Sequence, residues 1–218
     1  SDDGHDFTYL RNGSAASLMS RSDLAHPPVA AALSSCQILH LSGISQAISE
    51  SAADACFAAM DTVHSAGGKV SYDPNLRLKL WSLEKARSVI HKAMACCDIA
   101  LPGLDDARLL TGLQKVEDIA DFYLQLGAEI VALTLGVAGT LIATPDRREQ
   151  IPSFVVEAVD ATAAGDTFDG AFLAEYLVGS DAFAAARYAN AAAALSTTGY
   201  GAVAPIPTRA EVEALLTA

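Results

Sequence analysis

A chain of 218 residues, 51% of them hydrophobic, can bury one substantial core, and its length favours a single domain. Its net charge of −12 and its lack of any cluster of five or more Lys or Arg residues exclude the usual electrostatic footprint of a nucleic-acid-binding protein. The apolar runs are too short to span a bilayer and no secretory leader pattern is visible, so we expect a cytoplasmic protein without a membrane partner.

Apolar segments of strand length alternate with helical patterns over the first two thirds of the chain. The predicted strands cover residues 37–43, 69–73, 97–101 and 129–135, and the predicted helices cover residues 49–66, 82–95, 105–110 and 116–126. Repeated strand–helix units of this kind form a mostly parallel sheet with helices on both faces, which is an α/β fold. Ligands of such sheets bind outside the carboxyl ends of the strands, so functional residues are expected there.

The pattern changes in the last third of the chain. Residues 140–144 and 150–156 are predicted to be antiparallel strands across the turn at residues 145–148. Helices are expected at residues 165–178, where Phe168, Phe172 and Tyr176 share one stripe, and at the alanine-rich residues 181–196. A capping box of Thr208 and Glu211 predicts a final short helix. At the other end, residues 5–11 alternate like an edge strand that no strand–helix unit precedes.

The segment from Asp160 to Gly170 combines small residues with the start of a predicted helix. Small side chains allow a phosphate to approach the backbone, and the free N–H groups and dipole of a helix start can hold a transferring phosphoryl group without a lysine. Asp166 falls in that first turn, where a carboxylate can accept the proton of an attacking hydroxyl. Helix capping alone is an equally simple explanation of this aspartate.

Two glycines, Gly136 and Gly139, follow Thr134 at the end of the predicted buried strand. They permit a nucleotide to come close to the backbone, although an ordinary strand-to-strand turn requires glycines as well. Neither GxGxxG nor GxxxxGK[ST] occurs, which counts against dinucleotide oxidoreductases and P-loop enzymes. Asn190, alone among alanines on a helix expected to be buried, needs a hydrogen-bond partner that is either backbone or a bound nucleotide.

Polar residues follow two other strands. The segment from Asp73 to Trp81 includes Arg77, whose planar guanidinium suits a carboxylate or a phosphate, although a surface turn explains it too. Tyr9 and Arg11 share one face of the N-terminal edge strand. Asp106 begins a helix after the third strand and could orient a magnesium ion or its waters, with helix capping as the commoner explanation.

Together these segments resemble the ribokinase-like (PfkB-type) carbohydrate kinases over nearly the whole chain. The resemblance implies Asp166 as catalytic base, with Ala163, Ala164 and Gly165 as backbone donors of an anion hole. It implies ATP and Mg²⁺ as cofactors, with Thr134, Gly136, Gly139, Gly165 and Asn190 at the nucleotide and Asp106 reaching the metal through water. Two departures stand out, since the family usually has Gly in place of Ala163 and Asn in place of Gly103.

The resemblance is strongest to 2-keto-3-deoxygluconate kinases, through Asp73-Pro74-Asn75 with Arg77, Tyr9 with Arg11, and Gly13 to Ala16. It implies Tyr9, Arg11 and Arg77, beside Asp166, as contacts of a sugar acid, and two guanidiniums suit an acid better than a neutral sugar. We interpret residues 1–218 as one N-terminally incomplete ribokinase-like domain, with residues 1–13 as the remnant of a β lid.

The expected activity is transfer of the ATP γ-phosphoryl group to a primary hydroxyl of 2-keto-3-deoxygluconate or a similar sugar acid. Two alternatives stay open. One is another kinase of the family, acting on ribose, fructose or a nucleoside, and the other is a catalytically silent nucleotide-binding protein. A homo-oligomer also stays open.

Overall fold

The computed structural model describes residues 13–217, which fold around one sheet of six strands. The strands lie side by side in chain order, and the first four are parallel while the last two are antiparallel. The strands are β1 (Ile38–Ser42), β2 (Lys69–Asp73), β3 (Ile99–Ala100), β4 (Ile130–Thr134), β5 (Thr140–Ala143) and β6 (Arg148–Ile151). The predicted mostly parallel α/β sheet is therefore confirmed.

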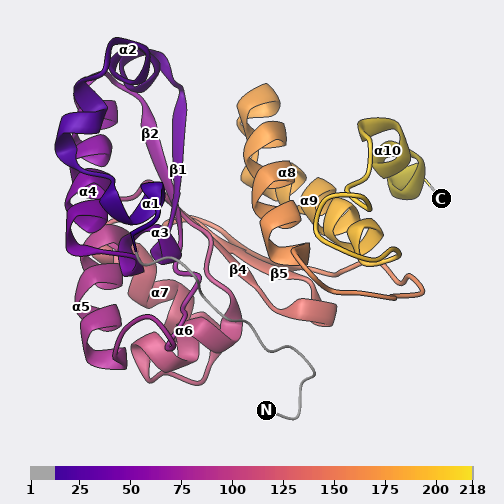
Figure 1. Ribbon diagram of the computed structural model, residues 1–218. Helices are drawn as coiled ribbons and strands as arrows, with labels where there is room; N and C mark the ends of the chain where they lie inside the picture. Colours follow the sequence, from indigo (N-terminus) through magenta and orange to yellow (C-terminus); the bar gives the residue numbers. More distant parts are fainter. Residues whose placement is uncertain (1–12, 218) are drawn as a thin grey trace.

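Helices cover both faces of this sheet (Figure 1). The strands β1 to β4 are added to the sheet one after another toward the same edge, and the connections between parallel strands are right-handed. All their helices therefore lie on one face, which α4, α5, α6 and α7 share. They span Glu50–Ser65, Leu83–Met94, Leu104–Thr111 and Val116–Leu126. The opposite face is covered by α8 (Ala164–Gly179) and α9 (Ala182–Ser196), and α10 (Arg209–Thr217) packs on α9.

The side-chain alternation of the central strand β4 explains why the sheet needs helices on both faces. Val131 and Leu133 pack into the core beneath α4, α5 and α7, whereas Ile130 and Ala132 pack into the core beneath α8 and α9. On that second side the predicted aromatic stripe of α8 is confirmed, because the rings of Phe168, Phe172 and Tyr176 stack in series. Helix α8 is thereby anchored with its first turn at the carboxyl ends of the parallel strands.

Two expectations about the elements were wrong or incomplete. The last strand was predicted over residues 150–156, but the ladder ends at Ile151, because Pro152 has no N–H to continue it. Short helices that the sequence analysis missed precede and follow β1: α1 (Ala15–Leu18), η1 (Arg21–Ala25), α2 (Pro27–Ser35) and α3 (Gly43–Ala47). A further 3-10 turn, η2 (Gly136–Ala138), joins β4 to β5.

The C-terminal capping box is confirmed. Thr208 donates its N–H and its hydroxyl to the Glu211 carboxylate at 2.7 Å, and the Glu211 N–H donates back to the Thr208 hydroxyl. Between residues 13 and 217, no helix combines the length and the apolarity that crossing a bilayer requires.

Candidate functional site

A polar cavity of about 220 Å³ opens at the carboxyl ends of the parallel strands. Its lining comes from the ends of β2, β3 and β4, from the start of α6, and from the start of α8 with the loop before it. These residues are Asp73, Asn75, Arg77, Leu101, Gly103, Asp106, Thr134, Ala161, Ala163, Ala164, Gly165, Asp166 and Asp169. The sequence placed Arg77, Asp106, Thr134 and the segment around Asp166 in one site, and the fold brings all of them to this cavity.

The start of α8 has the features that an anion needs. No side chain caps the helix at Ala163, and the amides of Gly165 and Asp166 have no hydrogen-bond acceptor among the described residues. Such unpaired N–H groups at the positive end of a helix dipole attract negative charge. Asp166 is the third residue of α8, is solvent-exposed, and forms no ion pair with any described residue. Its carboxylate is therefore available to a ligand in the cavity.

A second cavity, of about 440 Å³, adjoins the first and is mostly apolar. The turn between β4 and β5, with Gly136 and Gly139, forms one wall, and α9 and the segment after β6 form the others. Thr134, Ala161, Ala164 and Gly165 line both cavities. Asp166 lines only the smaller one. The start of α8 therefore stands between a small polar compartment that contains a carboxylate and a larger apolar compartment.

Three carboxyl groups of the smaller cavity lie in an environment that disfavours their charge. Burial is the main cause in each case. It raises the pKa of Asp73 to about 7, with Asp106 and Asp166 adding to the effect and the Asn75 N–H and Arg77 opposing it. Burial also raises the pKa of Asp106, and it raises that of Asp169, beside Asp73 and Asp166, well above its usual range. Groups with such perturbed pKa values in a cavity are typical of functional sites.

Backbone geometry at the end of β2 directs two polar groups toward this cavity. Asn75 has a positive φ of 36°, which is uncommon for a residue with a side chain, and its N–H donates to the Asp73 carboxylate. The Asn75 side-chain oxygen is buried without a hydrogen-bond partner among the described residues. Arg77 is exposed and donates to the carbonyl of its neighbour Leu76, and within residues 13–217 its other donors are open to a ligand.

Comparison with known proteins shows the family. Residues 1–209 match the family described as pfkB family carbohydrate kinase. The chain belongs to the PfkB family of carbohydrate kinases. Accordingly, it is a sugar kinase of this family, and the fold and family resemblance inferred from the sequence are both confirmed.

Relatives of this PfkB-family kinase carry different sugar names. The probable fructokinase-4 of Arabidopsis thaliana is 33% identical over 99% of this chain and 68% of its own length. The 2-dehydro-3-deoxygluconokinase of Bacillus subtilis is 32% identical over 97% of this chain and 64% of its own length. A solved structure of a putative ribokinase II from E. coli, in complex with ATP and Mg²⁺, has a TM-score of 0.88 at 29% identity, covering 97% of this chain and 67% of that one.

The Asn190 side chain forms its hydrogen bonds with other residues of the kinase. It accepts a hydrogen bond from the Thr140 hydroxyl at 2.7 Å and donates to the carbonyls of Ile151 and Pro152. Of the two partners left open by the sequence, the structure shows a protein partner. Asn190 lines the larger cavity but is 4% exposed, so its main effect is to hold the cavity wall together.

Two predicted substrate contacts, Tyr9 and Arg11, lie outside the described residues, as does nearly all of the predicted lid strand at residues 1–13. Asp106 accepts a hydrogen bond from the Leu76 N–H through one oxygen. Among residues 13–217, no three His, Cys, Asp or Glu side chains are grouped to hold a metal ion. Mg²⁺ in phosphotransferases keeps several waters and takes phosphate oxygens, so one carboxylate such as Asp106, acting through water, fits that mode of binding.

The sequence analysis missed three residues around Asp166. Asp73 was noted as part of a turn and of a family motif but was given no role in the site, Asp169 was not singled out, and His40 was assigned no role. Asp169 follows Asp166 by three residues, and that helical spacing was the one local signal that places both on one face. His40 comes from β1, more than a hundred residues earlier in the chain, so no spacing in the sequence connects it to α8.

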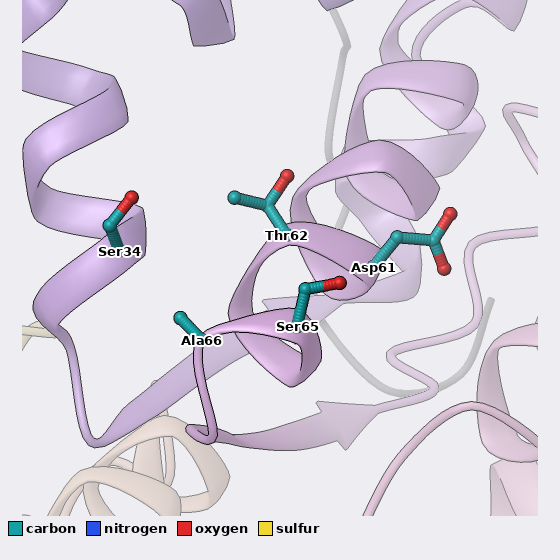
Figure 2. A pocket seen from close by; sticks show the side chains of 5 residues that line it. All are labelled: Ser34, Asp61, Thr62, Ser65 and Ala66. Carbon is teal, nitrogen blue, oxygen red and sulfur yellow. The ribbon is translucent and has the colours of Figure 1, made fainter.

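Another hollow, of about 420 Å³, lies between α2 and the C-terminal end of α4 (Figure 2). Its lining consists of Ser34, Asp61, Thr62, Ser65 and Ala66. Because α4 ends just before β2 begins, this hollow lies at the amino edge of the parallel sheet, opposite the site. The hydroxyls of Ser34 and Thr62 already donate to carbonyls of their own helices. It contributes nothing to the chemistry at α8.

Ala163 has a left-handed conformation with φ of 60°, which explains why glycine is usual at this position of the family. Ala163→Gly should relieve about 1–2 kcal/mol of backbone strain, while the greater freedom of glycine in the unfolded chain returns about 0.5–1 kcal/mol. We expect urea unfolding to show a net gain between about 0 and 1.5 kcal/mol. A loss of stability in the glycine variant would contradict the assigned backbone conformation.

Proposed function

We propose that this kinase transfers the γ-phosphoryl group of ATP to a primary hydroxyl of a keto-deoxy sugar acid such as 2-keto-3-deoxygluconate. The observation that carries the proposal is the pair of adjoining cavities that meet at the start of α8, with Asp166 on the polar side only. Two substrates that exchange a phosphoryl group must meet end to end at one point. The shared wall of Thr134, Ala164 and Gly165 supplies such a point.

In this proposal Asp166 is the catalytic base. It stands in the first turn of α8, faces the smaller cavity and has no competing ion pair among residues 13–217. A sugar hydroxyl bound there would give its proton to this carboxylate as the oxygen attacks phosphorus. The amides of Ala163, Ala164 and Gly165 are the proposed anion hole, in which N–H groups and the helix dipole oppose the charge that develops on the phosphoryl oxygens. The Gly165 N–H has no acceptor among the described residues, whereas the Ala164 N–H donates to the Ala161 carbonyl at 3.2 Å and must leave it to bind a phosphoryl oxygen.

The larger cavity is the proposed ATP site, with Thr134, Gly136, Gly139 and Gly165 beside the nucleotide and Asn190 as a positioning residue. Its volume and apolar lining suit a nucleotide base and ribose. A relative solved with ATP and Mg²⁺ supports the same cofactors here. When bound, Mg²⁺ neutralises charge on the phosphates, and Asp106 is the residue proposed to orient it through water.

The choice of a sugar acid rests on Arg77, together with the predicted contacts Tyr9 and Arg11. The Arg77 guanidinium of this cavity favours an anionic ligand, because its planar fork can bind a carboxylate through two hydrogen bonds. One named relative acts on such an acid. The fructokinase relatives favour a neutral ketose as the second candidate, and ribose, a nucleoside or a silent nucleotide-binding role are weaker alternatives. A cytoplasmic location and any oligomeric state stay predictions.

Arg77→Ala tests the substrate class. We expect the KM for 2-keto-3-deoxygluconate to rise about 10- to 100-fold, the loss of roughly 1.4–3 kcal/mol that a charge-assisted hydrogen bond supplies, while the KM for ATP changes little. The measurement is a coupled kinase assay with the sugar acid, fructose and ribose. Arg108→Ala is the matched control, because the Arg108 guanidinium lies outside both cavities and its hydrogen bonds within the described part of the chain go to the Gln114 carbonyl. A wild-type preference for fructose, or an equal effect of Arg77→Ala on both KM values, would contradict the sugar-acid proposal.

A further inference from the structure

Asp169 is the most unusual ionisable group of the kinase. It lies on α8 one turn after Asp166, lines the smaller cavity and is only 5% exposed. No described residue donates a hydrogen bond to its carboxyl group, and the His40 ring lies beside it, with Nε2 4.0 Å from Asp169 Oδ2. An isolated carboxylate at such depth is costly, so the group needs either a proton or a positive partner.

The position of the His40 ring makes it the candidate for that positive partner. It stands on β1, and its Nδ1 makes a 2.8 Å hydrogen bond to the hydroxyl of Ser71, which is fully buried on the neighbouring strand β2. This bond orients the ring so that Nε2 faces Asp169. The span of 4.0 Å is too long for a direct hydrogen bond, so the two groups interact through their charges. The His40 side chain keeps 37% of its surface exposed, which leaves the pair in contact with solvent protons.

The surroundings of this pair are strongly acidic. Asp73, from the end of β2, and Asp166, from α8, both face Asp169, and Arg77 and Asp106 stand beside Asp73. Burial, with the charges of Asp73 and Asp166, raises the pKa of Asp169, while burial lowers the pKa of His40 and Asp166 opposes that change. One proton makes the pair neutral wherever it resides. On Asp169 it gives a carboxylic acid beside a neutral imidazole, and on His40 it gives a carboxylate beside an imidazolium. Their separation of 4.0 Å places each group in the electric field of the other, so protonation of one affects protonation of the other.

We propose that His40 and Asp169 are a positioning pair for the base Asp166, holding one shared proton so that the pair stays neutral during turnover. The inference rests on the proposed role of Asp166. Only one full negative charge is then presented by this turn of α8. Loss of the shared proton at higher pH places a second charge beside Asp166, where it repels the phosphoryl group and any anionic sugar.

The test is a set of pH profiles of kcat and of the two KM values. For the wild type we expect kcat/KM for the sugar acid to fall about tenfold on the alkaline side, as one proton leaves the pair. Asp169→Asn keeps the shape of the side chain and cannot ionise, so its alkaline fall should disappear. His40→Gln removes one of the two sites for the proton, which lowers the proton affinity and moves the fall to lower pH. Asp61→Asn, an exposed aspartate of the distant hollow in Figure 2, should leave the wild-type profile unchanged.

An alkaline fall that persists in Asp169→Asn, or one that stays in place in His40→Gln, would overturn the proposal. A change only in Tm, with the profile of the wild type retained, would show a purely structural role and overturn it equally.

A second measurement needs no turnover. In the substrate-free kinase, NMR titration should give one shared apparent pKa for the Asp169 carboxyl carbon and the His40 ring, and in Asp169→Asn the ring should titrate alone and at lower pH. Two unrelated pKa values would refute the pair. A shared step in a wild type that phosphorylates no sugar would refute the function proposed for Asp166 while leaving the pair intact, so the two failures are distinguishable.

Discussion

Asp166→Asn is expected to reduce kcat by about 10²- to 10⁴-fold, the range that a general base supplies. The amide keeps the size and shape of the carboxylate but cannot take the proton of the attacking hydroxyl. Binding of ATP should change by no more than about threefold, because the amides of the α8 start and the larger cavity remain. The substitution also removes a negative charge that repels the phosphates of ATP, so it should not weaken nucleotide binding.

The measurement is single-turnover phosphorylation of the preferred sugar, together with calorimetric titration of a non-hydrolysable ATP analogue. Asp61→Asn again supplies the matched control, since it removes an exposed carboxylate at the opposite edge of the sheet. If Asp166→Asn turned over at the wild-type rate, Asp166 could not be the base. If it lost analogue binding as severely as turnover, Asp166 would act in holding the nucleotide.

Much of the fold around Asp166 could be predicted from the sequence, because the signals for these strands and helices are local. The Val- and Leu-rich run of β4 requires burial on both faces, the aromatic stripe of α8 requires one buried face, and both were placed correctly. The small residues before Asp166 marked the helix start in the same way. The helices between residues 15 and 35 were missed, although Ser20 with Asp23 and the proline pair at Pro27 are recognisable start signals.

The electrostatic setting of the site could not be predicted, because it depends on contacts between segments far apart in the chain. His40, Asp73 and Asp169 come from β1, the end of β2 and α8, and only the sheet order brings them together. Likewise, the sequence left the partner of Asn190 undecided between backbone and nucleotide. The answer depended on where Ile151 and Pro152 end the last strand, which is a feature of tertiary packing.

The end of β6 at Ile151 also explains why Gly139→Ala should strongly destabilise the wall of the nucleotide cavity. A methyl group on Gly139 would lie 2.0 Å from the Ile151 carbonyl oxygen and 2.7 Å from two further backbone atoms, and the residue has φ of 93°. Strain and forced backbone movement together should cost about 3 kcal/mol, which lowers Tm by roughly 10 °C in a chain of this size. The shift of the Ile151 carbonyl also breaks its bond to Asn190, so the KM for ATP should rise.

Gly136→Ala is the control that separates the two costs of Gly139→Ala, the steric clash of the methyl group and the strain of the left-handed backbone. Gly136 has φ of 59°, and a methyl group there would meet no atom within 4 Å, so only the left-handed conformation is penalised, at about 1–2 kcal/mol. The two variants are compared by thermal unfolding and by ATP titration. Gly139→Ala should have the lower Tm and the lower affinity for ATP. Equal losses in the two variants would mean that the β4–β5 turn can move away from Ile151, and that the wall of the proposed ATP site is not fixed by this contact.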